Sequence, residues 1–423
     1  MAPLPSSDQP VSVVQTGCCI VGAGPAGAIL GLLLARAGVE VTLLESHADF
    51  DRDFRGDTIH PSTLELLDQL GLSERLHALQ HGKLQTMRLM TAHGSVTLAD
   101  LGRLKTPFPY IMTLPQARLL ELLTSEAGRY ANFRLLMQAN VQRLVEEEGE
   151  IRGVRYRNTE NRWHEVRAQV TIAADGRFSK IRKLAGIEPV GVAPPMDVVW
   201  LRLPKRASDQ AENAEIHVGG GRFAVILDRG DEWQIGYIIL KGSFAALREA
   251  GLPALRAGLT QLMPWLADRV ELLQDWKQMA VLNVESSRVP TWHKPGLLLI
   301  GDAAHVMSPI GGVGINVAIQ DAVETANLLS EPLRRGQVTE NDLAQVQRQR
   351  EFAVKVVQRV QRIMQDRIAA PGLKSSGDFQ LPWLLRMITC TPGLRNIPGR
   401  IMAFGPRRVR LRELAPVVAP TQA

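Results

Sequence analysis

A chain of 423 residues is too long for one compact core and suits two closely packed domains. Hydrophobic residues make up 45% of it and charged residues 22%, which is the balance of a folded globular protein and excludes global disorder. The formal net charge of +6 is spread along the sequence without a nucleic-acid-binding module, so we expect no binding to nucleic acid.

The cysteines indicate a reducing compartment. Cys18 and Cys19 lie together in an apolar run typical of a buried strand, and with Cys390 they are too few for a disulfide framework. The first ten residues do not resemble a secretory signal, and glycines interrupt the apolar stretch 18–35, which favours a nucleotide-binding turn over a membrane span. We therefore expect a cytoplasmic protein, and the sequence contains no conspicuous metal-binding cluster.

The beginning of the chain predicts a nucleotide-binding unit. Residues 17–21 have the pattern of a short buried strand, GAGPAG follows at once, and a helical pattern covers residues 28–37. A second strand pattern, VEVTLLE, ends in Glu45, and an acid at this spacing can accept hydrogen bonds from a ribose. The unit predicts a dinucleotide site, but it does not separate NAD from FAD.

The three glycines of this turn have different structural roles. Gly22 makes the tight turn, Gly24 lets the backbone approach a pyrophosphate, and Gly27 brings helix and strand close together. Pro25 and Ala26 complete the turn. We expect the pyrophosphate at the helix N-terminus, because unpaired amides and the positive end of the helix dipole stabilise an anion there without a basic side chain.

Two segments farther along the chain repeat the combination of strand, turn and helix. VTIAADGRFSKIRKLAG places a β-branched strand before Asp175 and Gly176 and a helix after them. Residues 295–329 give another buried strand, a turn at Gly301 and Asp302, a glycine-rich loop and a long amphipathic helix.

Together the three segments resemble the three motifs of the class A flavoprotein monooxygenases. This family of aromatic hydroxylases includes the p-hydroxybenzoate, phenol and ubiquinone-pathway hydroxylases and the tetracycline-inactivating monooxygenases. The resemblance extends from about residue 17 to about residue 329. The matching residues are Ala174, Asp175, Gly176, Ser179 and Arg182 in the second motif, and Gly301, Asp302, Ala303, Ala304, His305, Pro309, Gly312, Gly314 and Asn316 in the third.

The resemblance implies an α/β fold in which an FAD-binding Rossmann-like βαβ fold carries an inserted antiparallel-sheet substrate domain and C-terminal helices. It implies non-covalent FAD as the cofactor, and NADH or NADPH and O2 as co-substrates. It also implies hydroxylation of an aromatic or polyketide-like small molecule through a flavin C4a-hydroperoxide, with bulk water excluded. No catalytic side chain is assigned, because the flavin itself makes the oxidant.

The third motif implies the contacts nearest to the flavin ring. By the resemblance, the carboxylate of Asp302 bonds the ribityl hydroxyls. Residues 309–316, from here on the 309–316 loop, lead into a helix whose N-terminus faces the pyrimidine side of the flavin and favours its reduction. Pro309 and Gly312 therefore lie beside the flavin, and glycines allow the close approach. His305 is commonly structural in the family, and we assign it no acid-base role.

Two earlier segments add cofactor contacts. Arg55 begins a stretch that resembles the one in which the family brings an arginine to the FAD pyrophosphate, with a surface ion pair as the alternative. Gln116 occupies a position that often reaches the ribityl or phosphate region, although Arg118 is a rival for that role. The complete set of predicted cofactor-binding residues is Gly22, Gly24, Pro25, Ala26, Gly27, Glu45, Arg55, Gln116, Asp175, Gly176, Gly301, Asp302, Pro309, Gly312, Gly314, Ile315 and Asn316.

Alternating apolar runs predict a substrate domain. The predicted FAD-binding domain comprises residues 1–84, 116–187 and 291–370, and the predicted substrate domain comprises residues 85–115 and 188–290. Short strands such as AEIHVGG, RFAVILDR and EWQIGYIIL suggest an antiparallel sheet there. Periodicity does not say which side chains face a substrate, and the candidates are His217, Phe223 and Tyr237, with Met87, Met90 and Met112 for an apolar lining.

The end of the chain departs from the compact part of the family. Residues 338–370 have a charge-rich helical pattern whose arginines we expect on a solvated face. Residues 371–423 form a predicted C-terminal helical extension, with a linker and two short amphipathic pieces. This extension can pack on the same chain, make a homodimer contact or lie on a membrane surface through Trp383 and the terminal arginines. Monomer and homodimer both stay open.

Other activities occur on the same fold. Within oxygenases, an epoxidase or a Baeyer-Villiger-type ring-opening enzyme is the alternative, and an isoprenoid reductase would use FAD without O2. The Trp-x-Trp-x-Ile-Pro signature of the flavin-dependent halogenases is absent from the sequence. A non-enzymatic FAD-fold escort protein is disfavoured by the intact cofactor motifs.

Overall fold

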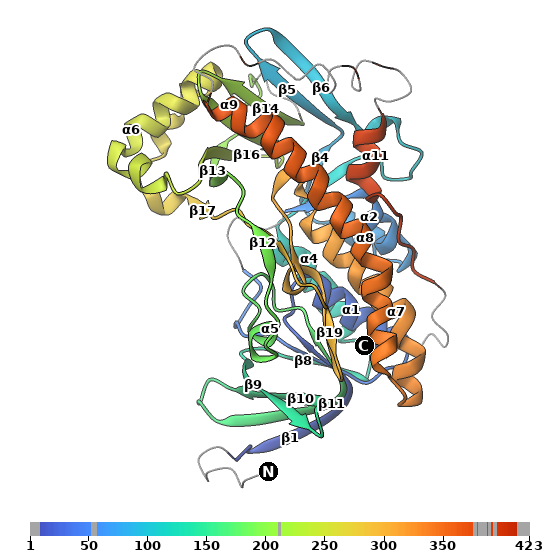
Figure 1. Cartoon of the computed structure of the whole chain (residues 1–423). Coiled ribbons are helices and arrows are strands. Elements are labelled where there is room, and N and C mark those ends of the chain that lie inside the picture. Colours follow the sequence, from blue (N-terminus) through green and yellow to red (C-terminus); the bar gives the residue numbers. More distant parts are fainter. Residues whose placement is uncertain are drawn as a thin grey trace.

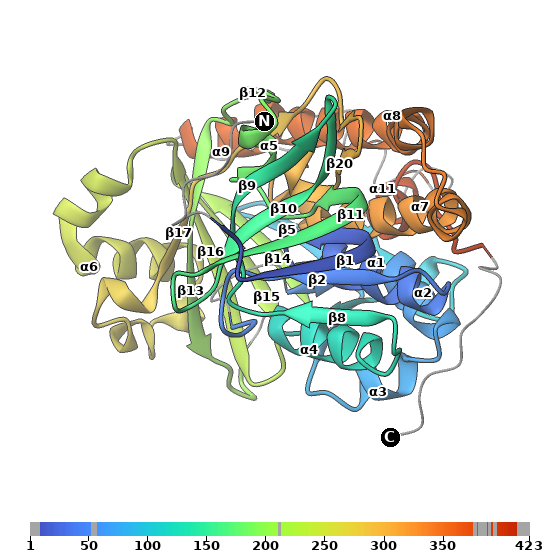
Figure 2. The same cartoon turned by 90° about the horizontal axis from the view of Figure 1, so that it is seen from below.

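A largely parallel β-sheet carries the first glycine-rich turn (Figures 1 and 2). The computed structural model describes residues 9–51, 57–209, 213–374 and 396–412, together with residues 379, 387 and 391. The strand order is β19-β20-β11-β1-β2-β8, and the antiparallel strands β10 and β9 continue from β11. The bounds are β1 Ser12–Val21, β2 Val41–Leu44, β8 Phe133–Leu136, β9 Asn140–Glu147, β10 Glu150–Arg157, β11 Trp163–Ala173, β19 His293–Lys294 and β20 Leu297–Leu299.

The first strand is longer than the sequence predicts. The expected strand 17–21 is the fully apolar half of β1, which pairs with both β2 and β11. Residues 12–16 pair only with β11 and are exposed or partly buried. This half includes polar residues because a single neighbouring strand covers it, and the prediction from an apolar run stopped short of it.

Helix α1 (Pro25–Arg36) forms the centre of the core beside this sheet. Residues 26–35 are all buried, which explains why an apolar pattern surrounds the whole helix rather than one stripe. It packs against α4 (Gln116–Ala127) and α7 (Gly314–Arg335). Cys18 and Cys19 lie fully buried in the strand below it, and burial raises the pKa of the Cys18 thiol to about 12, so this thiol stays protonated.

The predicted insert forms a seven-stranded sheet, mostly antiparallel, with the order β17-β13-β16-β15-β14-β5-β6. Its strands come from residues 86–100 and 196–282, within the two stretches predicted for the substrate domain, while the domain limits stay a prediction. The bounds are β5 Thr86–Thr91, β6 Gly94–Asp100, β13 Met196–Pro204, β14 Ala214–Gly219, β15 Arg222–Asp228, β16 Glu232–Leu240 and β17 Ala280–Leu282.

The two faces of this sheet have different neighbours. Helix α6 (Phe244–Leu262), which is broken at Gly251, covers the outer face, and Figure 2 shows it on the side away from α1. The inner face packs against residues of the 309–316 loop and the end of α8. The inner face carries Val198, Trp200, Arg202, Phe223, Val225, Gln234, Gly236 and Ile238, and the outer face carries Val199, Leu201, Ala224, Ile226 and Tyr237.

Small elements connect the two sheets. A three-stranded sheet of β3 (Thr58–Ile59), β7 (Ile111–Thr113) and β4 (Gly82–Leu84) lies beside the hairpin between β15 and β16. A second one joins β12 (Val190–Val192), β18 (Ser286–Arg288) and β21 (His305–Val306). The remaining short helices of the first half of the chain are α2 (Pro61–Gln69), α3 (Ser73–His77) and α5 (Lys180–Leu184).

A buried charge cluster joins α7 to α8 (Glu340–Met364). Asp321 is fully buried and accepts from Arg350 Nε at 2.7 Å, and its other oxygen lies 2.6 Å from His305 Nε2. Burial opposes ionisation, but His305 and Arg350 together lower the pKa of Asp321, so the carboxylate is charged. The expectation of a solvated arginine face is wrong for Arg350, because this partner 29 residues away holds its guanidinium in the interior.

The described part of the C-terminal extension packs on both halves of the protein. Helix α11 (Asn396–Phe404) contacts α2 in the FAD-binding half and β6 in the seven-stranded sheet, and His60 Nδ1 donates to Met402 O at 2.7 Å. Asn327 Nδ2 donates to Arg410 O at 2.9 Å. The predicted linker, Trp383 and Cys390 lie outside the described residues, except for the end of α9 (Ala370–Lys374) and Phe379.

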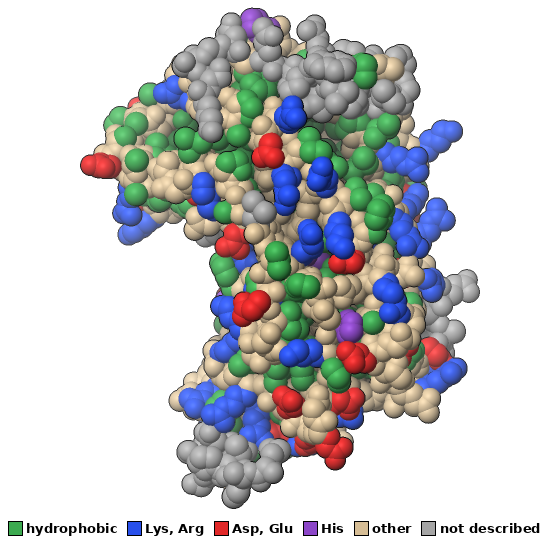
Figure 3. All heavy atoms as spheres, in the orientation of Figure 1, with side chains coloured by type: hydrophobic (Ala, Val, Ile, Leu, Met, Phe, Trp, Pro, Cys, Tyr) green, Lys and Arg blue, Asp and Glu red, His purple; other side chains and the backbone are tan. Residues whose placement is uncertain are grey.

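Charged side chains are distributed rather than gathered. In Figure 3 lysine and arginine side chains lie over much of the visible face, and acidic side chains lie among them, most of them in the lower half. Within the described residues, every helix is too short or too polar to cross a membrane. The cytoplasmic location and the membrane-surface alternative for the extension stay predictions.

The buried imidazole of His60 predicts a pH-dependent stability. Burial lowers its pKa from 6.5 to about 4, so protonation favours the unfolded chain. The stabilisation is complete above about pH 6.5 and decreases as the pH falls towards 4. Between pH 7 and pH 5 we expect wild type to lose about 2 kcal/mol more unfolding free energy than His60→Asn, measured by urea denaturation.

The control is His81→Asn. His81 makes the same kind of bond, from Nδ1 to Leu79 O, but it is only partly buried. This variant should follow the wild-type pH dependence, and equal slopes for wild type and His60→Asn would contradict the prediction.

Candidate functional site

The first glycine-rich turn is shaped by close backbone contacts. A Cβ on Gly22, whose φ is +99°, would lie 2.5 Å from Ala174 O, and a Cβ on Gly27 would overlap Gly22 O. These two glycines are therefore required by packing. A Cβ on Gly24 would meet nothing within 4 Å, so the backbone there borders open space. This arrangement fits a cradle into which a ligand brings its own atoms.

The N-terminus of α1 lies at this open space. Gly24 is its N-cap residue, Pro25 is the first helical residue, and no side chain caps the end. The amides of Ala26 and Gly27 belong to the first turn, where a helix leaves its N–H groups unpaired. Together with the positive end of the helix dipole, they fit the predicted pyrophosphate of FAD.

Glu45 lies directly after β2 and holds the turn. Its Oε2 accepts from Ala23 N at 3.1 Å, and its Oε1 accepts from His47 N at 3.0 Å and lies 2.6 Å from His47 Nδ1. Burial alone would raise the pKa of Glu45, but the bonds from His47 and Ala23 lower it. The site therefore presents a charged acceptor beside the turn, which suits the predicted ribose contact.

The second motif uses its aspartate to build a helix. Asp175 accepts from Ser179 Oγ at 2.5 Å, from Lys180 N at 2.7 Å and from Ile181 N at 3.0 Å, so both carboxylate oxygens are engaged at the start of α5. Burial nevertheless raises its pKa. Gly176, with φ +79°, follows it. A cofactor contact from Asp175 is therefore most readily made by its backbone, which lies against Gly22.

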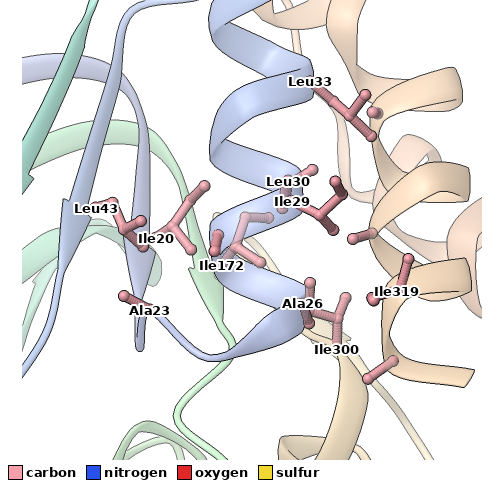
Figure 4. Packing of buried hydrophobic residues seen from close by; sticks show 14 of the residues in the cluster. Ile20, Ala23, Ala26, Ile29, Leu30, Leu33, Leu43, Ile172, Ile300 and Ile319 are labelled. Carbon is pink, nitrogen blue, oxygen red and sulfur yellow. The ribbon is translucent and has the colours of Figure 1, made fainter. Parts of the chain in front are cut away.

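An arginine links the second motif to the third. Arg182 is buried, and its Nη1 donates to Ala303 O at 2.9 Å. A Cβ on Gly301 would lie 3.5 Å from the Cβ of Ala26, and Figure 4 shows Ala26 beside Ile300, which precedes the turn. The three motifs, which are far apart in the sequence, therefore meet at one edge of the parallel sheet. Asp302 lies on this turn and is only partly buried.

The 309–316 loop contains the short helical turn Ile310–Gly312 and ends in α7. Gly311 and Gly312 have φ values of +78° and +61°, and a Cβ on Gly312 would lie 2.5 Å from Thr58 Oγ1. No side chain caps α7, and Gly314 and Ile315 in its first turn are partly exposed. This uncapped end can stabilise negative charge on a flavin ring placed beside it.

Asn316 fastens this loop to the rest of the protein. Its Oδ1 accepts from His60 N at 2.9 Å and Thr63 Oγ1 at 2.8 Å. Its Nδ2 donates to Thr58 O at 3.2 Å and to Gly312 O at 3.5 Å. All four hydrogen-bonding positions of the amide are engaged, so the predicted cofactor contact of Asn316 can come only from its backbone.

The remaining cofactor candidates have different positions. Arg55 lies outside the described residues. Gln116 is the first residue of α4, and its backbone N–H donates to the Asp57 carboxylate. Arg118 is exposed and pairs with Glu121 at 3.1 Å, which leaves Gln116 as the better placed of the two rivals.

Register separates the three substrate candidates. His217 lies opposite Ala224, and Ala224 lies opposite Tyr237, so His217 and Tyr237 belong to the outer face under α6. Phe223 lies on the inner face, where it is packed near Gly372 of α9. Of the three candidates, only Phe223 therefore lies on the face that meets the 309–316 loop, and the other two side chains lie on the opposite face.

Sequence reasoning missed Trp200. It lies opposite Gly236 on the inner face, and a Cβ on Gly236 would lie 2.9 Å from the Trp200 Cζ3 atom. The indole therefore lies across Gly236 and stays partly exposed. A tryptophan in one predicted strand and a glycine in another could have indicated an aromatic side chain lying on a flat part of the sheet. Only the strand register, however, places Trp200 opposite Gly236. No group of three metal-binding side chains occurs among the described residues.

The open space at Gly24 predicts a loss of FAD affinity without loss of fold. In Gly24→Val the added side chain would fill the cradle, so we expect at least about tenfold weaker FAD binding, equivalent to about 1.4 kcal/mol. Flavin fluorescence titration of apoprotein measures the affinity, and thermal unfolding of the same apoprotein checks the fold.

Gly219→Val is the matched control, because a Cβ on Gly219 also meets nothing within 4 Å but lies in the seven-stranded sheet. It should bind FAD as wild type does. Unchanged FAD affinity in Gly24→Val would show that this space is not the cradle.

Comparison with known proteins agrees with this geometry. Residues 15–360 match the family described as FAD binding domain. The chain is 34% identical to the 6-methylpretetramide 4-monooxygenase of Streptomyces rimosus over 405 residues, which is 95% of this chain and 96% of the relative.

Solved structures share the fold. A probable FAD-dependent monooxygenase of Pseudomonas aeruginosa, pqsL, has a TM-score of 0.72 at 20% identity, over 85% of this chain and 97% of its own. The OxyS anhydrotetracycline hydroxylase of Streptomyces rimosus has a TM-score of 0.72 at 23% identity, over 92% and 76%. The chain therefore belongs to the FAD binding domain family and is an FAD-dependent monooxygenase.

Proposed function

We propose that this monooxygenase hydroxylates a planar polycyclic aromatic molecule of the polyketide type, held between the inner face and the 309–316 loop. The observation that carries the proposal is the inner face itself. Trp200, Val225 and Ile238 give it an apolar centre, and Ile310 of the loop packs against the same cluster. The full-length relative that acts on 6-methylpretetramide supports a polycyclic substrate for this chain.

The inner face changes from apolar to polar along its strands. Arg202 and Gln234 lie opposite each other, two residues beyond Trp200 and Gly236. A planar molecule stacked on Trp200 would therefore direct one edge towards a guanidinium and a carboxamide, which suits the phenol and carbonyl oxygens of a polyketide. The stacked rings gain burial and aromatic contact, while these polar groups orient the molecule.

When bound, FAD supplies the redox chemistry, accepting electrons from NADH or NADPH and activating O2. The protein positions the reactants, stabilises charge and excludes water. The uncapped end of α7 stabilises negative charge beside Gly314, and the glycines of the loop allow the close approach. Apolar residues of the inner face exclude water from the reacting atoms. We assign no side chain as a catalytic acid or base.

Trp200 tests the position of the substrate. Trp200→Ala removes the stacking surface, and we expect the substrate dissociation constant to rise about tenfold to a hundredfold, because aromatic contact and burial together contribute about 1.5–3 kcal/mol. Trp200→Phe should recover most of the loss. Substrate-induced changes of the flavin spectrum measure the dissociation constant.

Trp276→Ala is the control, because Trp276 is also partly buried but packs beneath α6 on the outer side. It should leave substrate affinity unchanged. An equal loss of affinity in both variants would place the effect in general stability rather than in stacking.

The activity itself is tested with planar polycyclic phenols. We expect each good substrate to stimulate NADH or NADPH oxidation, to consume O2, and to gain one atom from 18O2 as a hydroxyl, detected by mass spectrometry. Oxygen incorporated as an epoxide or a ring lactone would favour the alternative oxygenases. Product formed without O2 would favour a reductase.

A further inference from the structure

We propose that Arg229 and Asp57 form a positioning link that transmits occupancy of the inner face to the 309–316 loop. The proposal rests on the proposed function, because it assumes that the substrate lies on the inner face. Neither residue is a catalytic residue here, since each acts through its neighbours.

The link begins with a buried ion pair between the two halves of the protein. Arg229 follows β15 in the seven-stranded sheet, and Asp57 precedes β3 in the FAD-binding half. Arg229 Nη1 lies 2.6 Å from Asp57 Oδ2, and the side chains are only 7% and 8% exposed. Burial raises the pKa of Asp57, and the positive charge of Arg229 opposes that shift. Each charge therefore depends strongly on the other.

On the substrate side, the same guanidinium nitrogen reaches the inner face. Arg229 Nη1 donates to Gln234 Oε1 at 2.7 Å. Gln234 lies two residues before Gly236, which the indole of Trp200 covers. A substrate stacked on Trp200 therefore has Gln234 as a neighbour. A new hydrogen bond from the substrate to this carboxamide competes with, or reorients, the bond that holds Arg229.

On the cofactor side, Asp57 continues directly into the support of the loop. The next residue, Thr58, donates from Oγ1 to Gly312 O at 3.0 Å and accepts at its carbonyl from Asn316 Nδ2 at 3.2 Å. The Asp57 carbonyl also accepts from Leu114 N at 2.8 Å. A shift of Asp57 therefore reaches both Gly312 and Asn316 of the 309–316 loop through Thr58.

This chain of contacts is continuous from Gln234 to Gly312, and every step is a short hydrogen bond, an ion pair or a peptide bond. Spatial continuity alone does not establish coupling between two sites, so the test measures the coupling itself. It compares the response of the loop to substrate in variants that keep or lose the pair.

The main variant is the double substitution Asp57→Leu with Arg229→Met. Replacing both members of a buried ion pair by apolar residues commonly preserves folding, whereas removing one leaves an unpaired charge. The single variants Asp57→Asn and Arg229→Gln complete a double-mutant cycle.

The first readout is hydrogen–deuterium exchange of the 309–316 loop, with and without a planar polycyclic phenol. In wild type we expect the substrate to change the exchange rate of this segment at least about fivefold, which is the lower end of typical coupling between two sites. In the double variant we expect a change of less than about twofold. The second readout is the ratio of anaerobic flavin reduction rates with and without the phenol. We expect this ratio to fall by a similar factor while substrate affinity changes less than about threefold.

Arg269→Gln is the matched control. Arg269 and Asp209 form a similarly buried pair, 1% and 2% exposed, at 2.6 Å. This pair holds the outer side of the same sheet through Trp233, so its loss should lower stability but keep the response of the loop to substrate. A double variant that keeps the wild-type response, or a control that loses it equally, would overturn the link.

The outcome also separates the link from the proposed function. If wild type shows no response to any polycyclic phenol, the substrate class fails. Exchange of the 309–316 loop in apoprotein without ligand then still tests the link, because loss of the pair should speed exchange there and Arg269→Gln should not. Equal ligand-free exchange in wild type and the double variant would refute it.

Discussion

Contact between the backbone of Gly22 and the backbones of Ala174 and Gly27 is the constraint on which the rest of the structure depends. It brings β1, β11 and α1 closer than any side chain would allow. Ala26 then lies against the turn that contains Gly301, so the third motif meets the first. A Cβ on Gly24 would meet nothing within 4 Å, so open space lies in front of this part of the backbone. The proposed cofactor cradle is therefore lined by backbone, and the Glu45 side chain holds the turn through the amide of Ala23.

Buried charges join the layers that this cradle needs. Asp321 holds His305 and Arg350, and so fixes α7 and α8 behind the third motif. Asp57 holds Arg229, and so fixes the seven-stranded sheet against the FAD-binding half. Such pairs add little net stability, since removing two charges from water is costly. Their value lies in geometry, because a charged pair tolerates far fewer arrangements than an apolar contact does.

The two halves of the protein contribute differently to the proposed reaction. The parallel sheet with its three motifs belongs to a fold that is shared with the probable monooxygenase pqsL and the hydroxylase OxyS. The inner face of the other sheet presents Trp200 and Gln234, on which the proposed substrate contact depends. Because one fold can host many reactions, the proposed substrate class rests on the residues of this face and not on the fold.

The sequence by itself determined the cofactor motifs, their order and the kind of element on which each lies, because glycine-rich turns after apolar strands are local features. It also predicted the antiparallel strands near residues 214–240, since alternation is local as well. Only the tertiary structure decided which strand face meets the 309–316 loop, that Tyr237 points away and Trp200 inward, and that Arg350 is buried. It alone paired Arg229 with Asp57, 172 residues apart. These outcomes depend on strand register and helix packing, which arise from contacts between distant segments that no local pattern encodes.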